Sequence, residues 1–249
     1  MKHAKRHPLI FGTIILTATG LITRVIGFFY RIYLSRLFGE EGMGIYQLLS
    51  PALSLSFSLT AAGYQTAISK YVAADSAKRP SGNLKPLLAG ISITLPLSLV
   101  TNAILFFSAD PIGIFLLKDH RTVPMLRILS FSVPFAALHA CINGYFYGKK
   151  KASVPALTQL LEQLARVSCV FLVTGADLAE GRTPSINAAV LGLTVGEIFS
   201  MLIALVCLYI HLYPDNRILS LSNICPSVPV YRDLLGMALP LTANRIILN

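Results

Sequence analysis

Residues 128–148 read ILSFSVPFAALHACINGYFYG, an apolar run without any Asp, Glu, Lys or Arg. Similar charge-free runs occupy residues 43–69 and 86–109. A helix needs roughly 20 apolar residues to cross the hydrocarbon core of a bilayer, and each run is long enough. The whole chain is 54% hydrophobic and 13% charged, whereas a soluble domain carries about a quarter charged residues. The sequence therefore predicts an all-α integral membrane protein and excludes a soluble domain.

Apolar windows predict six complete membrane spans. They occupy residues 9–37, 44–70, 86–109, 124–147, 153–176 and 186–212. A seventh apolar segment begins near Tyr231 and the sequence stops at Asn249, so we expect a chain cut within that helix, because a bilayer cannot satisfy a broken backbone end. The first span follows a basic N-terminus as in a signal peptide, but it is too long and lacks a small-residue cleavage site, which predicts a retained span.

Basic residues mark alternate loops. Lys2, Lys5 and Arg6 precede the first span, Lys78, Arg79 and Lys85 follow the second, and Lys149, Lys150 and Lys151 follow the fourth. Because Lys and Arg accumulate on the cytoplasmic side of membrane proteins, the N-terminus is predicted to be cytoplasmic. The net charge of +10 sits in these short clusters, so we expect anionic lipid headgroups as partners and no nucleic acid.

No sequence pattern points to catalysis. The four cysteines, Cys141, Cys169, Cys207 and Cys225, lie far apart without paired spacing, which predicts neither a metal site nor a disulfide framework. The sequence contains no phosphate-binding glycine loop, nucleophile elbow or metal-ligand spacing. We therefore expect a protein that is not an enzyme and that carries no cofactor and no metal.

The first span carries a polar stripe. Its members, within a sector about 80° wide at 100° per residue, are Thr13, Thr17, Gly20, Arg24, Gly27, Arg31 and Ser35. Holding an arginine at bilayer depth costs about 3 kcal/mol on insertion scales, so such a residue is a functional candidate. The planar guanidinium fork suits phosphate, and we predict that Arg24 and Arg31 bind a pyrophosphate. Snorkelling to the interface or pairing with buried carboxylates are the structural alternatives.

Charged residues also interrupt the fifth and sixth spans. Glu162 and Arg166 have i,i+4 spacing and can neutralise each other on one helix face. The pair is either structural or a gate that opens when substrate or a coupling ion competes for one partner. Glu197, in the sixth span, could bind a proton or a sodium ion, or balance the arginines. His139 is expected to be a packed histidine.

Three stretches resemble one family. They are GLITRVIGFFYRIYLSRLFGEEGMGIYQL (20–48), AAGYQTAISKYVA (61–73) and GYFYGKKKASVPALTQLLEQLARVS (144–168). Together they resemble the polysaccharide-exporter branch of the multidrug/oligosaccharidyl-lipid/polysaccharide flippase superfamily, and within it the stage V sporulation protein B group. The resemblance covers essentially the whole chain.

The resemblance implies a two-lobe, MATE-like transporter with a central cavity. Residues 1–212 would then form the N-terminal six-helix lobe, 213–230 a cytoplasmic linker between lobes, and 231–249 the start of the second lobe and its seventh helix. In related flippases, cavity arginines of the first helix engage the pyrophosphate, and Arg24 and Arg31 match that pattern.

The implied function is alternating-access flipping of an undecaprenyl-pyrophosphate-linked saccharide across a bacterial cell membrane, for the cell wall or the spore cortex. Membrane potential or a coupling ion, a proton or sodium, would supply the energy. Two alternatives stay open. A cation-coupled multidrug exporter of the same superfamily would use the carboxylates first, and a membrane scaffold would transport nothing.

Overall fold

The computed structural model describes residues 8–78, 84–213 and 226–248, and every regular element in that part of the chain is helical. The α-helices are α1 (Pro8–Leu48), α2 (Ser50–Phe57), α3 (Gly63–Lys78), α4 (Lys85–Phe107), α5 (Ala109–Pro111), α6 (Thr122–Gly148), α7 (Ser153–Ala179), α8 (Asn187–Leu212) and α10 (Val228–Leu248). Two π-helical segments are η1 (Ser58–Ala62) and η2 (Ile112–Leu116). The predicted third to sixth spans coincide with α4, α6, α7 and α8 to within a few residues.

The boundary between the first two spans differs from the prediction. A loop was expected near Glu40 and Glu41, but the helical stretch α1 continues to Leu48. The change of direction is confined to Gly39, with φ 68° and ψ −175°. Glycine adopts a positive φ without steric cost, so one residue kinks the helix where a longer loop was predicted.

The second span is helical throughout, but its hydrogen-bond pattern changes at Leu49 and again in η1. Pro51 lies in the first turn of α2, where a missing backbone N–H costs nothing, and it prevents α1 from continuing into α2. The π-helical η1 then follows α2 directly and leads into α3. Extra residues of this kind in a helix often occur at functional sites.

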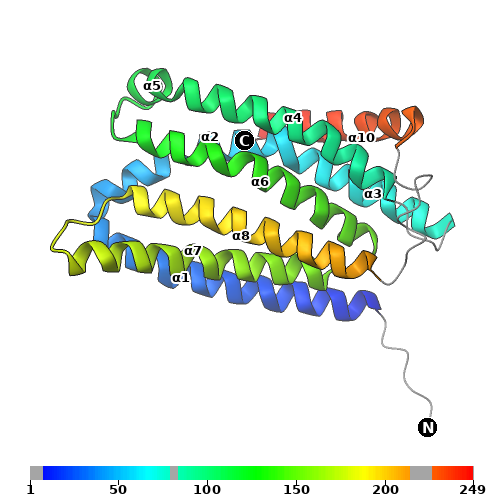
Figure 1. Ribbon diagram of the computed structural model, residues 1–249, viewed down its shortest axis with the longest axis horizontal. Coiled ribbons are helices and arrows are strands. Elements are labelled where there is room, and N and C mark those ends of the chain that lie inside the picture. The colour runs from blue at the N-terminus through cyan, green and yellow to red at the C-terminus, as the bar shows by residue number, and fades with distance from the viewer. Residues whose placement is uncertain (1–7, 79–83, 214–225, 249) are drawn as a thin grey trace, which may run out of the picture.

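Five helical stretches among the described residues are long and apolar enough to cross a membrane. The first, Gly12–Ser76, has 65 residues. A straight helix of that length would measure about 100 Å, far more than a hydrocarbon core of about 30 Å. Figure 1 shows α1 and α3 running in opposite directions along the bundle, so this stretch accounts for two predicted spans.

The long helix α6 forms the centre of the bundle. It packs against α3, α4 and α8, and most of its side chains are buried. Tyr145 and Phe146, near its C-terminal end, belong to the largest buried apolar cluster. A helix that is buried on most sides constrains the positions of the surrounding helices, because each of them must pack closely against its side chains.

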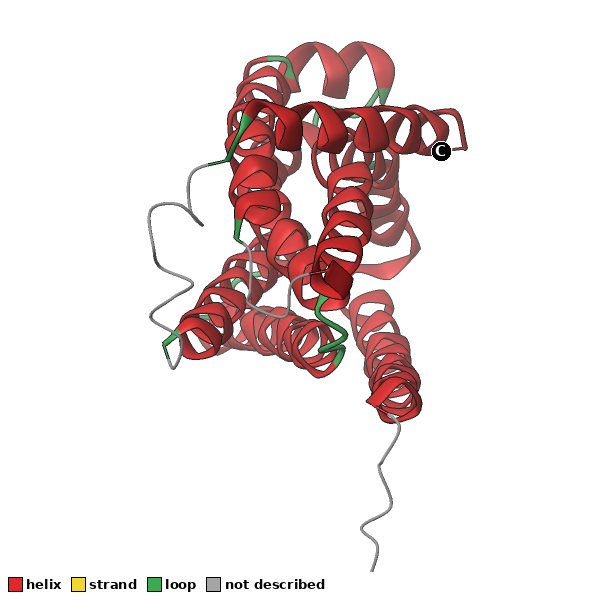
Figure 2. Ribbon diagram, turned by 90° about the vertical axis from the view of Figure 1, so that its right-hand side faces the viewer, coloured by secondary structure: helices red, strands yellow, loops and turns green. Residues whose placement is uncertain are grey.

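The helices α1 and α10 lie at opposite margins of the bundle (Figure 2). α1 contacts mainly α7, and its N-terminal half is largely exposed. α10 packs against α3, α4 and η1 and adds Val230, Leu234 and Ala238 to the same buried cluster as Tyr145. The first residue of α3, Gly63, lies against α10: a Cβ placed there would sit 2.9 Å from the carbonyl oxygen of Ala238.

Polar contacts connect loops and helix ends at each end of the bundle. At one end, Arg121 pairs with Glu41 at 2.7 Å and with Asp119 at 3.0 Å, and its hydrogen bonds hold the pKa of the Asp119 carboxyl below its ordinary value. At the other end, the Lys151 Nζ lies 2.9 Å from the His211 Nδ1. The segments predicted to share a side of the membrane therefore lie at the same end. Which end faces the cytoplasm stays a prediction.

We expect Gly63→Ala to destabilise the native gene product by about 1–3 kcal/mol, because overpacking forces the neighbouring backbone to shift. The added Cβ would press on α10. Heating in detergent followed by size-exclusion chromatography measures the effect. Gly175→Ala is the matched control, since a Cβ there meets no atom within 4 Å. Equal thermal stability of the two variants would contradict this close approach.

Candidate functional site

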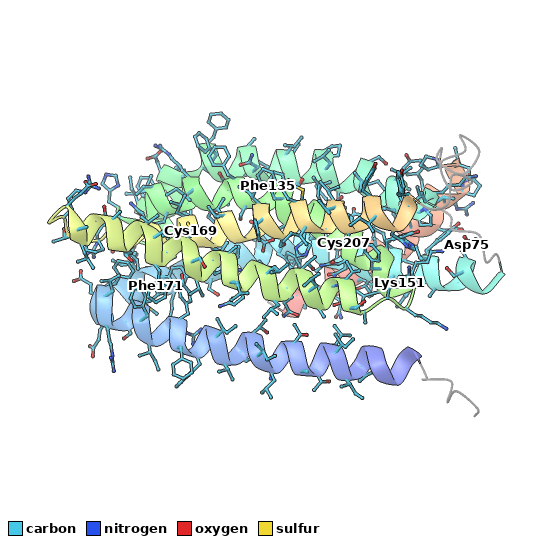
Figure 3. The ribbon with its side chains drawn as sticks, turned by 60° about the horizontal axis from the view of Figure 1, so that its bottom comes forward. Asp75, Phe135, Lys151, Cys169, Phe171 and Cys207 are labelled. Carbon is cyan, nitrogen blue, oxygen red and sulfur yellow. The ribbon has the colours of Figure 1, made fainter. Side chains whose placement is uncertain are left out.

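The polar stripe of α1 lies beside its contact with α7. The contact itself is made by Tyr33, whose hydroxyl lies 2.7 Å from the Thr174 Oγ1 and whose ring stacks on Phe171 with centroids 4.0 Å apart. Figure 3 shows Phe171 on the side of α7 that faces α1. Gly27 marks the edge of the stripe, since a Cβ there would lie 3.7 Å from the Gln163 Nε2.

Both candidate arginines of the stripe are exposed. Arg24 and Arg31 form no hydrogen bond or ion pair with any side chain that the structure describes. One structural alternative was that buried carboxylates neutralise these arginines. In residues 8–78, 84–213 and 226–248, no carboxylate forms an ion pair with either of them. Uncompensated guanidiniums remain free to bind an anion.

Arg31 lines a recess of about 150 Å³ between α1, α2, α6 and α8. We call it the Arg31 recess. Its other lining residues are Tyr46, Gln47, Leu49, Ser50, Leu53, Leu129, Val190 and Leu193. The binding of pyrophosphate by Arg24 and Arg31 stays a prediction.

A second recess adjoins the first. It measures about 240 Å³, and Ser50 and Leu53 line both. Hydroxyl groups and one carboxylate are its polar lining: Ser50, Ser54, Ser56, Thr60, Ser132 and Glu197. We call this part the Glu197 recess and the two together the polar cavity. A guanidinium thus lies at one end of this space and a carboxylate at the other, with several hydroxyl groups between them in a mainly apolar lining.

The fifth span carries the ion pair that its spacing predicts. Arg166 Nη2 donates to Glu162 Oε1, and Arg166 Nη1 donates to Gln163 Oε1 at 3.3 Å. The side chains of Arg166 and Glu162 are only 20% and 17% exposed. The pair is therefore largely removed from the surface, and removing one partner would leave an uncompensated buried charge.

A histidine joins this pair to the sixth span. His139 Nδ1 lies 3.7 Å from Glu197 Oε2 and 2.8 Å from Ser200 Oγ, and His139 Nε2 lies 2.7 Å from Asn143 Nδ2. Thr158 Oγ1 in turn donates to Asn143 Oδ1 at 3.4 Å. The buried network thus connects α6, α7 and α8.

The charges of the buried network do not balance while His139 is neutral. When both carboxylates are ionised, Glu162 and Glu197 contribute two negative charges and Arg166 contributes one positive charge. Ligand atoms of His139, Glu162 and Glu197 all lie within 4.8 Å of one another. Charges at low dielectric need compensation, so this arrangement suits one additional proton or one small cation.

Tyr46 lies between the polar cavity and the buried network. It lines the Arg31 recess, and the charges of Arg31 and Arg166 both act on its hydroxyl group. Glu197 makes a second link, since it lines its own recess and contacts His139. An anion bound at Arg31 would therefore change the electrostatic environment of the network.

Sequence reasoning missed part of this network. His139 was predicted to be a packed histidine, and Asn143 and Ser200 were given no role. One signal was present: His139 and Asn143 lie four residues apart in the C-terminal half of α6, which is mostly apolar. Thr194 is close to Glu197 in the sequence, but its hydroxyl donates to the carbonyl oxygens of Ile128 and Val190 and does not join the network.

Comparison with known families gives a match over nearly the whole chain. Residues 9–249 match the family described as polysaccharide biosynthesis protein. Stage V sporulation protein B of Bacillus subtilis (strain 168) is 34% identical over 239 residues, which cover 96% of this chain and 46% of that protein. Lipid II flippase MurJ of the same strain is 27% identical over 179 residues, covering 68% of this chain and 32% of that protein. The chain spans less than half the length of these relatives.

Solved structures share the fold. A multidrug resistance MATE family transporter of the MOP superfamily, in an outward-facing conformation, superposes with a TM-score of 0.70 at 15% identity. The match covers 98% of this chain and 56% of that one. A MATE structure in complex with Br-NRF gives a TM-score of 0.68 at 17% identity, covering 96% and 56%. The predicted all-α, MATE-like membrane fold is therefore confirmed.

We expect Arg166→Gln to lower the free energy of unfolding by about 3 kcal/mol, because a buried carboxylate loses its partner. The double variant Glu162→Gln/Arg166→Gln should be more stable than the single one, because both charges are removed together. Thermal denaturation of the native gene product in detergent measures both effects.

The matched control is Arg182→Gln, which breaks the ion pairs of the exposed Arg182 with Asp177 and Glu180. Such pairs contribute about 0–1 kcal/mol, so little change is expected. If the double variant were less stable than Arg166→Gln alone, the charge argument for the buried pair would be wrong.

Proposed function

The chain belongs to the polysaccharide biosynthesis protein family, and we propose that it forms one lobe of a transporter that flips an anionic, lipid-linked saccharide across a bacterial cell membrane. The observation that carries the proposal is the polar cavity, which has hydroxyl groups in its wall and, at one end, Arg31 without an ion-pair partner among the described residues. The name of the relative Lipid II flippase MurJ supports it. Transport needs no covalent chemistry, so the proposed protein is not an enzyme.

The proposed cargo is a saccharide on undecaprenyl pyrophosphate, a precursor of peptidoglycan or another polysaccharide. Arg24 and Arg31 lie two turns apart on α1, about 10 Å along the helix axis. A pyrophosphate can therefore contact the two guanidiniums in succession as it moves along α1. The serine and threonine hydroxyls of the Glu197 recess can accept hydrogen bonds from the sugar, since those of Ser54, Ser56 and Thr60 donate their own protons to backbone carbonyls. The similarity to stage V sporulation protein B favours a role in the spore cortex or cell wall.

We propose alternating access as the mechanism. In this proposal residues 1–212 form the first lobe, 213–230 a cytoplasmic linker and 231–249 the start of a second lobe, with the N-terminus in the cytoplasm. Residues 214–225 of the linker lie outside the described part of the chain. The kink at Gly39 and the break before α2 give the cavity-lining helices positions at which they can bend.

The buried network would couple transport to an ion. Glu162, Arg166 and Glu197 would act as a gate that opens when a proton or a sodium ion joins the network at His139, Glu162 and Glu197. Binding of the anion at Arg31 would favour this uptake through Tyr46 and Glu197, which connect the cavity to the network. The same carboxylates favour the second candidate, a cation-coupled multidrug exporter.

We expect Arg24→Ala and Arg31→Ala to reduce translocation of a lipid-linked precursor in cells depleted of their own flippases. Hydrogen bonds to charged groups contribute about 1.5–3 kcal/mol each, so binding should weaken roughly ten- to hundredfold. Arg36→Ala is the matched control, because Arg36 is an exposed cation of α1 outside the polar stripe. Membrane abundance is measured for every variant by immunoblotting.

The outcomes separate the candidate functions. Loss of translocation in both stripe variants at normal abundance, with Arg36→Ala unaffected, supports the flippase. Normal translocation by Arg24→Ala and Arg31→Ala would reject the anion-binding role. A wild-type protein that translocates no precursor but exports cationic drugs would favour the multidrug exporter.

We expect Glu197→Gln to abolish stimulation of transport by an imposed proton or sodium gradient in proteoliposomes, because the amide removes one charge from the network. Glu180→Gln is the matched control, since Glu180 is exposed and pairs with Arg182 at 2.7 Å. Full gradient stimulation in Glu197→Gln would exclude Glu197 as a coupling residue.

A further inference from the structure

Both ring nitrogens of His139 lie within hydrogen-bond distance of other side chains. Nδ1 lies 2.8 Å from Ser200 Oγ and 3.7 Å from Glu197 Oε2, whereas Nε2 lies 2.7 Å from Asn143 Nδ2. An amide nitrogen only donates, so Nε2 accepts this hydrogen bond and the proton of the neutral imidazole resides on Nδ1. In this arrangement His139 donates toward Ser200 and Glu197 and carries no charge.

The Asn143 amide has a hydroxyl partner that can act in either direction. Asn143 Oδ1 lies 3.4 Å from Thr158 Oγ1, which also lies 3.0 Å from the carbonyl oxygen of Pro155. A threonine hydroxyl has one proton and can accept as well as donate. It donates to Asn143 when the amide oxygen faces it, and to Pro155 when the amide nitrogen does. The amide can therefore turn over, exchanging Oδ1 and Nδ2, and keep both of its contacts.

The turned-over amide is the one that a protonated histidine needs. Both nitrogens of an imidazolium donate, so each needs an acceptor. Nδ1–H keeps Ser200 and Glu197, and Nε2–H would donate to Asn143 Oδ1 at the contact that Nδ2 now makes. The net change is one new N–H bond, formed with a proton from solution. Asn143 and Thr158 are buried, so it matters that protein groups satisfy the amide in both states.

Protonation of His139 would also balance the buried charges. Glu162 and Arg166 of α7 and Glu197 of α8 face His139, and their sum is one negative charge when both carboxylates are ionised. An imidazolium brings this sum to zero. Charges at low dielectric need compensation, so the network favours the protonated ring.

The other helices packed on α6 carry their ionisable groups elsewhere in the described part of the chain. The segments α2, η1 and η2 contain none. The positions of the remaining ones are as follows: Tyr64 of α3 lies near Cys141, Lys70 and Asp75 of α3 line a cleft with α10, Lys85 begins α4, Asp110 of α5 pairs with Arg127, and Arg31 and Tyr46 of α1 line the Arg31 recess.

We propose that the coupling ion is a proton, that His139 binds it, and that Asn143 and Thr158 are positioning residues that accommodate the change of charge. The inference rests on the proposed coupling of transport to an ion, which left proton and sodium open. Hard cations take oxygen ligands. Here an imidazole lies at the centre of the network, and Glu162 Oε1 already accepts from Arg166. These groups suit a proton better than a sodium ion.

Solid-state NMR measures the charge of His139 directly. The native gene product is labelled with 15N-histidine and reconstituted in liposomes, and the His139 signals are assigned by their loss in His139→Gln. We expect the ring to change from neutral to protonated between about pH 8 and about pH 5, the range in which histidine ordinarily changes charge. Sodium added at constant pH should leave the signals unchanged.

Variants of the two positioning residues test the turning amide. Asn143→Leu deprives the imidazolium of an acceptor, so the proton affinity of His139 should fall about ten- to hundredfold, as expected for a hydrogen bond to a charged group. Thr158→Val should lower it in the same direction, and Thr158→Ser, which keeps the hydroxyl, should restore it. A purely structural role would change protein abundance and leave this proton affinity unaltered.

Transport gives a second readout. His139→Gln should abolish stimulation of translocation by an imposed proton gradient in proteoliposomes. His120→Gln is the matched control, because His120 is an exposed histidine in the loop before α6. It should leave the stimulation unchanged.

Three outcomes would overturn the inference: a ring that stays neutral over the whole pH range, full proton stimulation of His139→Gln, which would assign the proton to a carboxylate, and an unaltered proton affinity in Asn143→Leu. Translocation by a wild-type protein with a permanently neutral His139 would reject the inference and keep the flippase. A His139 that becomes protonated in a protein that translocates no precursor would reject the flippase and keep the proton site.

Discussion

A bilayer offers no hydrogen-bond partners to a backbone, and this constraint shapes the whole molecule. Each crossing has to be helical so that its N–H and C=O groups are satisfied internally. Departures from regular helix are therefore informative. Those of the first two spans, the kink at Gly39, the break at Leu49 and the π-helical η1, lie in or next to the segment that borders the polar cavity. The same bilayer makes every charge within a span expensive.

Charged side chains within the spans have two different environments. Glu162 and Arg166 compensate each other inside the bundle, and Glu197 with His139 completes a network of limited exposure. Arg31 stands at the wall of an open recess without a carboxylate partner among the described residues. The first arrangement favours a stable packing that responds to one added charge, and the second favours exchange of a bound anion. Tyr46 and Glu197 lie between the two.

The fold could be predicted largely from the sequence, because apolar run length alone identifies spans such as α6. The stripe with Arg24 and Arg31 and the Glu162–Arg166 pair follow from helical spacing, which is local. The contact between His139 and Glu197 depends on how α6 is rotated about its axis relative to α8. Residue spacing within one helix does not determine that rotation. The kink at Gly39 was missed because a single positive φ replaces the loop that two adjacent acidic residues suggested.

The packing of α10 has a consequence for biosynthesis and gene evolution. Val230, Leu234 and Ala238 complete a buried cluster whose other members come from earlier helices, and Gly63 admits the backbone of α10 at close range. During synthesis, that surface of α3 and α4 stays open to lipid until α10 has entered the membrane. The lobe boundary proposed before α10 would therefore separate two parts of the chain that share one buried cluster. If recombination exchanged the chain from α10 onward between two related genes, the new α10 would still have to pack closely against Gly63 of α3.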